Sequence, residues 1–177
     1  MKKVPEISLL FFLVTALCSC PYSSAYNLDE VPNIYVEDVL IGKWTTLKKN
    51  TGSKQEHLIT LSLSKRTDTE YNISFSGDLE VLRPFNVIKS DSITGTAFMS
   101  TVGGMQFLNI NIAARIYIAE IKLKDSRLSL LPLAEHFTAK MILNSSALRN
   151  SVDFHYKTRV HPILDDDFCL WEMQKLN

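Results

Sequence analysis

The sequence has no surplus of charge of either sign, few cysteines and little glycine or proline. Its 19 lysines and arginines balance 19 aspartates and glutamates, so it lacks the positive charge that a nucleic-acid-binding surface needs. Three cysteines are too few for a disulfide framework, and six glycines and six prolines exclude a low-complexity chain. Hydrophobic residues make up 46% of the sequence, which is enough for a folded core.

Motifs for catalysis and for metal or cofactor binding are also missing. There is no Gly-x-Ser-x-Gly elbow, and Gly103-Gly104 lacks the further residues of a phosphate-binding loop. The four histidines do not have the i, i+4 spacing of a zinc site. His155, His161 and the acidic run Asp165–Asp167 are close in sequence, but this stretch has no glycine for a calcium loop. We therefore predict a non-enzymatic protein without metal or cofactor, with a hydrolase as the weakest alternative.

The chain begins with the pattern of a secretory signal. Lys2 and Lys3 precede an apolar stretch from Ile7 to Leu17. At about 1.5 Å per residue, this stretch spans only about half of a hydrocarbon core of about 30 Å. It therefore predicts an export signal rather than a membrane-spanning helix.

The segment that follows, Leu17-Cys18-Ser19-Cys20, resembles the lipobox of bacterial lipoproteins. The resemblance implies a signal peptide over residues 1–19 and acylation of Cys20, including palmitate, which attaches the protein to a membrane of the cell envelope. The residue after Cys20 is Pro21 and not aspartate. In the sorting pattern of enterobacterial lipoproteins, this implies the outer membrane. Several acyl chains, at about 0.8 kcal/mol per buried methylene, make such attachment practically permanent.

Ordinary cleavage is the alternative to lipidation. Ser23-Ser24-Ala25 fits a small-x-small site and would release a secreted or periplasmic protein. Residues 20–33 lack periodicity. If Cys20 carries a lipid, they are predicted to tether a single domain over residues 34–177 to the membrane. Cys169 then has no disulfide partner, and its apolar neighbours predict a buried core residue rather than a reactive thiol.

Short strands follow one another along this domain. Apolar and polar residues alternate in His57–Lys65 and again in Tyr71–Ser76, which predicts an antiparallel pair. Further strands are expected at Trp44–Lys48, Glu80–Arg83, Ser92–Ser100, Met105–Asn111, Ile116–Lys124, Arg127–Leu133 and Phe168–Met173. In the last of these, alternation places Leu170 and Met173 on opposite faces. Roughly eight to nine antiparallel strands favour a closed barrel, because closure removes exposed edges.

Helical patterns are confined to three places. Ile34–Leu40 has apolar residues at spacings of three and four, which predicts a short helical turn before the first strand. Ala134–Leu143 predicts a first C-terminal helix. Ser145 or Ser146 is expected to cap a second short helix that contains Leu148 and Val152.

Gly42-Lys43-Trp44 resembles the Gly-x-Trp opening of the lipocalins. The resemblance implies a lipocalin-like antiparallel β-barrel whose base is closed by Trp44, with Arg127 or Arg149 as the arginine that packs on it. The run Leu128–Leu133 followed by a small helix is also similar to the C-terminal part of small bacterial lipoproteins that have no assigned activity.

The interior of this barrel is the predicted site. A barrel of about eight strands is either filled by its own side chains or holds one small ligand. We expect its lining to include Trp44, Ile59, Leu61, Leu63, Ile73, Phe75 and Ile118. The predicted function is binding of a small apolar ligand or lipid by a membrane-anchored envelope protein. The alternative is a filled barrel that serves as a scaffold for contact with another envelope protein.

Overall fold

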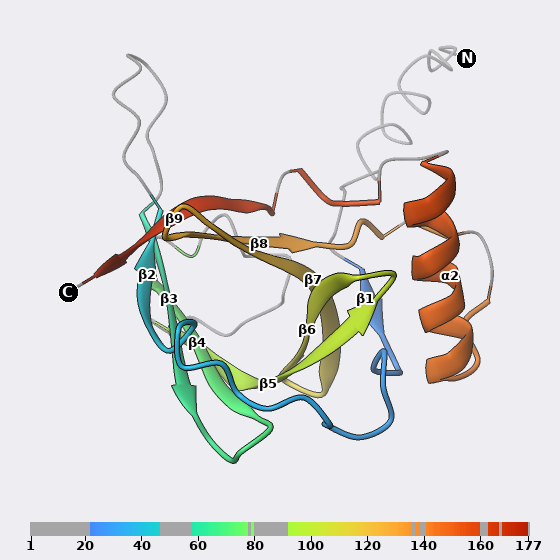
Figure 1. The fold of residues 1–177 in the computed structure, drawn as a ribbon, viewed down its shortest axis with the longest axis horizontal. Coiled ribbons are helices and arrows are strands. Elements are labelled where there is room, and N and C mark those ends of the chain that lie inside the picture. The colour runs from blue at the N-terminus through green and yellow to red at the C-terminus, as the bar shows by residue number, and fades with distance from the viewer. Residues whose placement is uncertain are drawn as a thin grey trace, which may run out of the picture.

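Eight antiparallel strands close into a barrel, and one helix lies against its outside (Figure 1). The computed structural model describes residues 22–46, 58–77, 79, 92–135, 137–138, 141–159, 163–166 and 168–176. The barrel strands are β2 (Gly42–Thr45), β3 (Ile59–Lys65), β4 (Tyr71–Gly77), β5 (Ser92–Val102), β6 (Met105–Ile112), β7 (Arg115–Lys124), β8 (Arg127–Pro132) and β9 (Leu170–Leu176). The mainly β architecture predicted from alternation is thereby confirmed.

Each barrel strand pairs with the next strand of the chain, and β9 pairs with both β8 and β2 to close the circle. The connection from β8 to β9 contains the helix α2 (Ser145–Thr158). A short additional strand, β1 (Ser23–Ser24), pairs with β7 at Ile116 and Tyr117. Since β8 pairs with β7 from Ala119 onward, β1 continues the sheet where β8 has left it.

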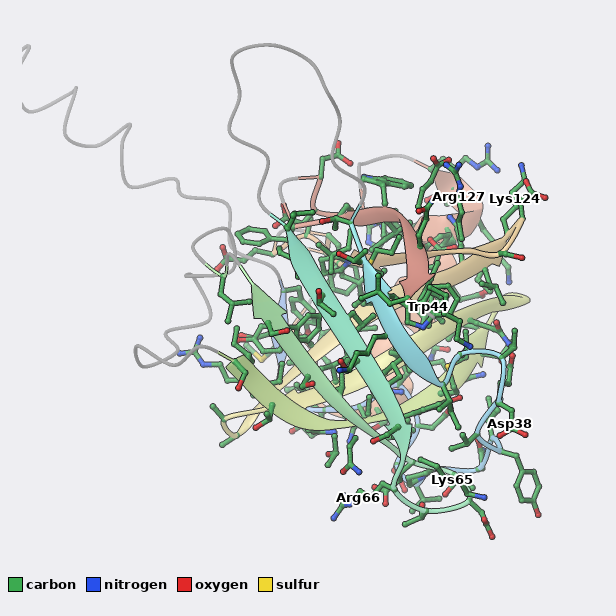
Figure 2. All side chains as sticks on the ribbon, turned by 90° about the vertical axis from the view of Figure 1, so that its left-hand side faces the viewer. Asp38, Trp44, Lys65, Arg66, Lys124 and Arg127 are labelled. Carbon is green, nitrogen blue, oxygen red and sulfur yellow. The ribbon has the colours of Figure 1, made fainter. Side chains whose placement is uncertain are left out.

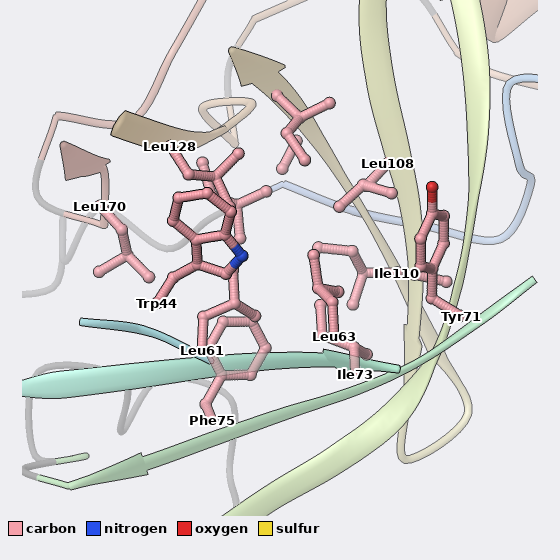
Figure 3. Close-up of a cluster of buried hydrophobic side chains, with 14 of the residues drawn as sticks. Trp44, Leu61, Leu63, Tyr71, Ile73, Phe75, Leu108, Ile110, Leu128 and Leu170 are labelled. Carbon is pink, nitrogen blue, oxygen red and sulfur yellow. The ribbon is translucent and has the colours of Figure 1, made fainter. Parts of the chain in front are cut away.

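The barrel interior is filled by side chains from alternate positions of the strands. Leu61 pairs with Phe75, and Leu63 pairs with Ile73, so the apolar residues of β3 and β4 point to the same side. They belong to an inner cluster of buried residues whose labelled members in Figure 3 are Trp44, Leu61, Leu63, Tyr71, Ile73, Phe75, Leu108, Ile110, Leu128 and Leu170. This cluster is the main core of the protein.

A second, outer cluster lies between the barrel wall and α2. Its buried members are Leu28, Val102, Phe107, Ile118, Leu133, Phe137, Leu148, Val152 and Ile163. Because β7 is covered on both faces, all five residues from Tyr117 to Ile121 are buried. Such a strand loses the alternation of a half-exposed strand. Ile118 therefore lies in the outer cluster, on the face opposite to the barrel interior.

The residues before β2 are packed onto the barrel, which differs from the tether that the sequence predicts for residues 20–33. The amide of Tyr22 donates to the Leu133 carbonyl at 2.8 Å. Leu28 is 1% exposed, and its amide donates to Oδ1 of the buried Asn109 at 2.7 Å. Asp29 forms an ion pair with Arg149 of α2 at 2.6 Å. Tyr22, Leu28 and Asp29 are thus part of the folded domain.

Residues 28–41, here named the N-terminal strap, then cross to the start of β2. The amide of Val36 donates to the Asp68 carbonyl at 2.8 Å, in the β3–β4 turn. The amide of Glu37 donates to the Tyr71 hydroxyl at 2.8 Å, and the Gln106 side chain donates to the Glu37 carboxylate at 2.8 Å. The strap therefore covers the end of the barrel that carries the β3–β4 and β5–β6 turns.

Charged side chains gather at the turns of this same end. Lys65 and Arg66 lie beside the β3–β4 turn, and Lys124 and Arg127 flank the β7–β8 turn (Figure 2). Lys65 is paired with Asp68 at 2.7 Å, and Arg127 is paired with Glu172 at 3.0 Å. Both pairs are exposed, so each contributes little to stability.

Two of the predicted helices are not seen. Residues 38–40 form a hydrogen-bonded turn, in which the Leu40 amide donates to the Glu37 carbonyl at 3.0 Å. The predicted N-terminal helical turn is therefore absent. The described residues of Ala134–Leu143 are likewise not helical, because Ala134 is hydrogen-bonded to the Ile163 carbonyl at 2.9 Å and continues the sheet-like pairing after β8.

The helix that does form begins one residue earlier than the predicted serine caps. The Asn144 side chain accepts a hydrogen bond from the Ala147 amide at 2.7 Å and acts as the N-cap. The helix ends at Thr158, and its C-cap Arg159 adopts a left-handed conformation with φ of 49°. Its buried face consists of Leu148, Ser151, Val152 and His155.

A bulge in β9 overturns one further expectation. Leu170 and Met173 both point into the barrel, although strict alternation places them on opposite faces. The pairing with β8 shifts between Leu128 and Leu130, and Glu172 has a positive φ of 47°. One extra residue at the bulge returns Met173 to the interior. The predicted strand Glu80–Arg83 and the predicted signal with Cys20 lie outside the described residues.

Candidate functional site

The barrel interior contains a small apolar cavity of ≈ 40 Å³. All of its lining side chains are aliphatic or aromatic: Phe75, Ile93, Ile110, Ile112, Tyr117, Ala119, Leu130, Pro132, Phe168 and Leu170. Ligand pockets for drug-sized molecules commonly enclose about 300–1,000 Å³. The cavity therefore has room for the tip of an apolar molecule and not for a whole one.

The position of the cavity follows from the strand order. Phe75 and Ile93 flank the β4–β5 connection, and Ile112 precedes the β6–β7 turn. In an up-and-down barrel, these connections lie at the end opposite to the β3–β4 and β5–β6 turns. The cavity therefore lies toward the end of the barrel that the N-terminal strap does not cross.

Six of the seven residues predicted to line a ligand site belong to the inner cluster: Trp44, Ile59, Leu61, Leu63, Ile73 and Phe75. Of these, Phe75 also lines the cavity. Ile118 lies in the outer cluster instead. The structure thus brings the alternating residues of β3 and β4 together in the interior, but most of them pack against one another away from the cavity.

Most cavity-lining residues were not among those predicted to line a ligand site. Ile110 and Ile112 alternate with Asn109 and Asn111 in β6, a pattern of period two that is visible in the sequence. Phe168, just before β9, and Leu170, the first residue of β9, are likewise two positions apart. What the sequence does not reveal is the pairing that places these distant strands around one space.

Trp44 closes the interior near the N-terminal strap. Its side chain is 1% exposed, and its indole Nε1 donates to the Leu40 carbonyl at 2.9 Å. The Lys175 ammonium lies 5.2 Å from the centre of the indole ring and donates to the Val39 carbonyl at 3.0 Å. A cation at this distance is attracted by the ring. Trp44 is therefore held by both the strap and β9.

The cation that packs on Trp44 is Lys175 and not one of the two expected arginines. Arg127 is instead paired with Glu172 at 3.0 Å. Arg149 binds Asp29 and the Thr101 carbonyl. Lys175 was missed because it lies in the last residues of the chain, after a bulge that hides its register with Trp44.

Cys169 has the properties of an unreactive thiol. Its side chain is half-buried, and burial, followed by the nearby Asp166 and Asp165 carboxylates, raises the pKa of the thiol from 9.0 to about 12. Since the thiolate is the nucleophilic form, almost no reactive species is present at neutral pH. The unreactive thiol agrees with the prediction, but Cys169 is only half-buried and is not a buried core residue.

No group of three or more metal-ligating side chains occurs among the residues that the structure describes. Within the same residues, no helix has the length and apolar character needed to cross a membrane. Comparison with protein-family models finds no match, and none is found among curated proteins or solved structures. The geometry of the barrel and its cavity is therefore what indicates a function.

Proposed function

We propose that this chain is a non-catalytic protein of the cell envelope that binds the apolar end of a small molecule or lipid in its barrel. The observation that carries the proposal is the cavity of ≈ 40 Å³, which lies away from the strap and is lined by aliphatic and aromatic side chains. Burial of an apolar group there is favourable by about 25 cal/mol per Å² removed from water. The rest of the ligand remains outside the cavity.

The anchor is part of the same proposal. Acylation of Cys20 would hold the domain at a membrane, with the outer membrane as the expected location. Mass spectrometry of the mature N-terminus tests it: a diacylated or triacylated Cys20 supports the anchor, and an unmodified Tyr26 start contradicts it. A Cys20→Ser variant should be released from the membrane fraction.

Filling the cavity tests the binding site. Ala119 lines the cavity, so Ala119→Leu adds three carbon atoms to that space. Ala147, in the first turn of α2 outside the barrel, offers the same substitution as a matched control. The probe is n-hexanol, titrated into the mature protein while the methyl resonances of Ile93, Ile110 and Ile112 are followed by NMR.

We expect saturable shifts of these methyl resonances in the wild type and in Ala147→Leu. Ala119→Leu should weaken binding by about tenfold or more, because a close-packed interior leaves no alternative space for the probe. Thermal unfolding of both variants establishes that they are folded. The proposal is wrong if hexanol produces no saturable shift in the wild type, or if Ala119→Leu binds it equally well.

A filled scaffold is the second candidate, and the small volume of the cavity favours it. In that case the barrel positions its outer surface for contact with another envelope protein. Native mass spectrometry of protein extracted from membranes separates the two candidates. A co-purified lipid or apolar molecule supports the binding function, whereas a stoichiometric protein partner without bound lipid supports the scaffold.

A further inference from the structure

A groove of ≈ 520 Å³ lies outside the barrel, between the C-terminal half of α2 and the β5–β6 hairpin with β7. Its volume is within the range of sites that take small molecules, about 300–1,000 Å³. It is separate from the apolar cavity, with which it shares no lining residue. The groove combines charged side chains with apolar lining.

The carboxylates of the groove are already occupied by donors from the protein. Glu120 is 2% exposed, and its two oxygens accept from Lys122 Nζ at 2.9 Å and from the Tyr156 hydroxyl at 2.8 Å. Asp153 is paired with Lys157 at 2.6 Å. These contacts compensate the cost of burying the Glu120 charge, and they leave little capacity to bind a cation from solution.

The cations of the groove remain accessible. The side chains of Lys122 and Lys157 are 52% and 70% exposed despite their ion pairs. Arg159 is exposed and forms no ion pair with a carboxylate in the described part of the chain. The C-terminus of α2 contributes about half a negative charge, which does not outweigh these three cations. The accessible charge of the groove is therefore positive.

The charge balance also limits the kind of anion. Lys122, Lys157 and Arg159 face two carboxylates and the partial negative charge of the helix C-terminus, which leaves a surplus of at most one positive charge. One surplus charge suits a monoanion better than a doubly charged phosphate. Met105 and Ile163 supply apolar lining in the same groove, where a short aliphatic or aromatic body would be covered.

We propose that this groove binds a small organic carboxylate with an apolar body. The Arg159 guanidinium is the main partner of the carboxylate, since its planar donors match the two oxygens. Lys157 adds positive charge, and Met105 and Ile163 contact the apolar part. The inference is independent of ligand binding inside the barrel, because no cavity residue takes part.

The test is an NMR titration of the mature protein with three probes: benzoate, benzyl alcohol and inorganic phosphate. Benzoate should produce saturable shifts of the amides of Gly103, Tyr156 and Ile163. Benzyl alcohol, which lacks the charge, and phosphate, which lacks the apolar body, should each bind at least about tenfold more weakly. Benzoate binding should also weaken as salt is raised, because the charges are partly exposed.

Arg159→Gln provides the variant and Arg115→Gln its control. Arg115 is an exposed arginine at the start of β7 that does not line the groove. Arg159→Gln should weaken benzoate binding by about tenfold, and Arg115→Gln should leave it unchanged. The proposal is overturned if benzoate does not saturate, if benzyl alcohol or phosphate binds as tightly, or if Arg159→Gln has no effect. A circular dichroism spectrum like that of the wild type establishes that the variant is folded.

Discussion

Truncation of Trp44 should remove a large part of the stability of the barrel. The indole is 1% exposed and hydrogen-bonded to the strap, and its ring faces Lys175. Trp44→Ala should therefore cost about 3–5 kcal/mol of unfolding free energy, as large truncations in a packed core do. Trp44→Phe keeps most of the volume but leaves the Leu40 carbonyl without its donor, so its expected cost is about 1–3 kcal/mol.

The chain contains its own control for this experiment. Trp171 lies on β9 with 51% of its side chain exposed, so Trp171→Ala should cost about 1 kcal/mol or less. Urea unfolding followed by far-UV circular dichroism compares the wild type with the three variants without depending on tryptophan fluorescence. If Trp44→Ala is within about 1 kcal/mol of Trp171→Ala, the indole does not close the barrel as described.

Two further predictions concern buried polar groups. Asn109→Leu should lower the free energy of unfolding by about 1–3 kcal/mol. It should also accelerate hydrogen exchange at the Leu28 amide, which loses its acceptor. Unchanged protection of that amide would contradict the role given to Asn109. Burial raises the pKa of Cys169 from 9.0 to about 12 and also raises the pKa of Tyr156 above 10.0. Because the unfolded chain releases these protons at lower pH, stability should fall as pH rises above about 9. Denaturation midpoints from pH 7 to 11 should show this fall, and Cys169→Ala with Tyr156→Phe should reduce it; a midpoint independent of pH in the wild type would refute the reasoning.

The strands were predictable where one face is buried and the other is exposed to solvent. In β3 and β4, serine, threonine and asparagine alternate with leucine, isoleucine and phenylalanine, so both the pairing and the inward face follow from the sequence. In β7 this signal disappears because the outer cluster, which includes Leu148 and Val152 of α2, covers its outer side. For this reason Ile118 was wrongly expected to face the barrel interior.

Other features depend on contacts between residues far apart in the chain. The N-terminal segment lacks periodicity, yet it is ordered by Asn109 and Arg149, which follow it by 81 and 120 residues. The bulge at Glu172 changes the facing of Met173 without any glycine to indicate it. The groove beside α2 was not predicted either, because Glu120 and Tyr156 meet only after the helix has packed on the sheet.

The ordered start of the domain bears on how an anchored molecule would be oriented. Tyr22 is fixed by its hydrogen bond to Leu133 and by its edge-to-face contact with the Phe137 ring, 4.8 Å away. Two residues of extended chain reach at most about 7 Å. A lipid on Cys20 would therefore be joined to the folded domain by almost no linker. The domain would therefore lie directly on the bilayer surface, with the side near Tyr22 and Phe137 turned toward the headgroups.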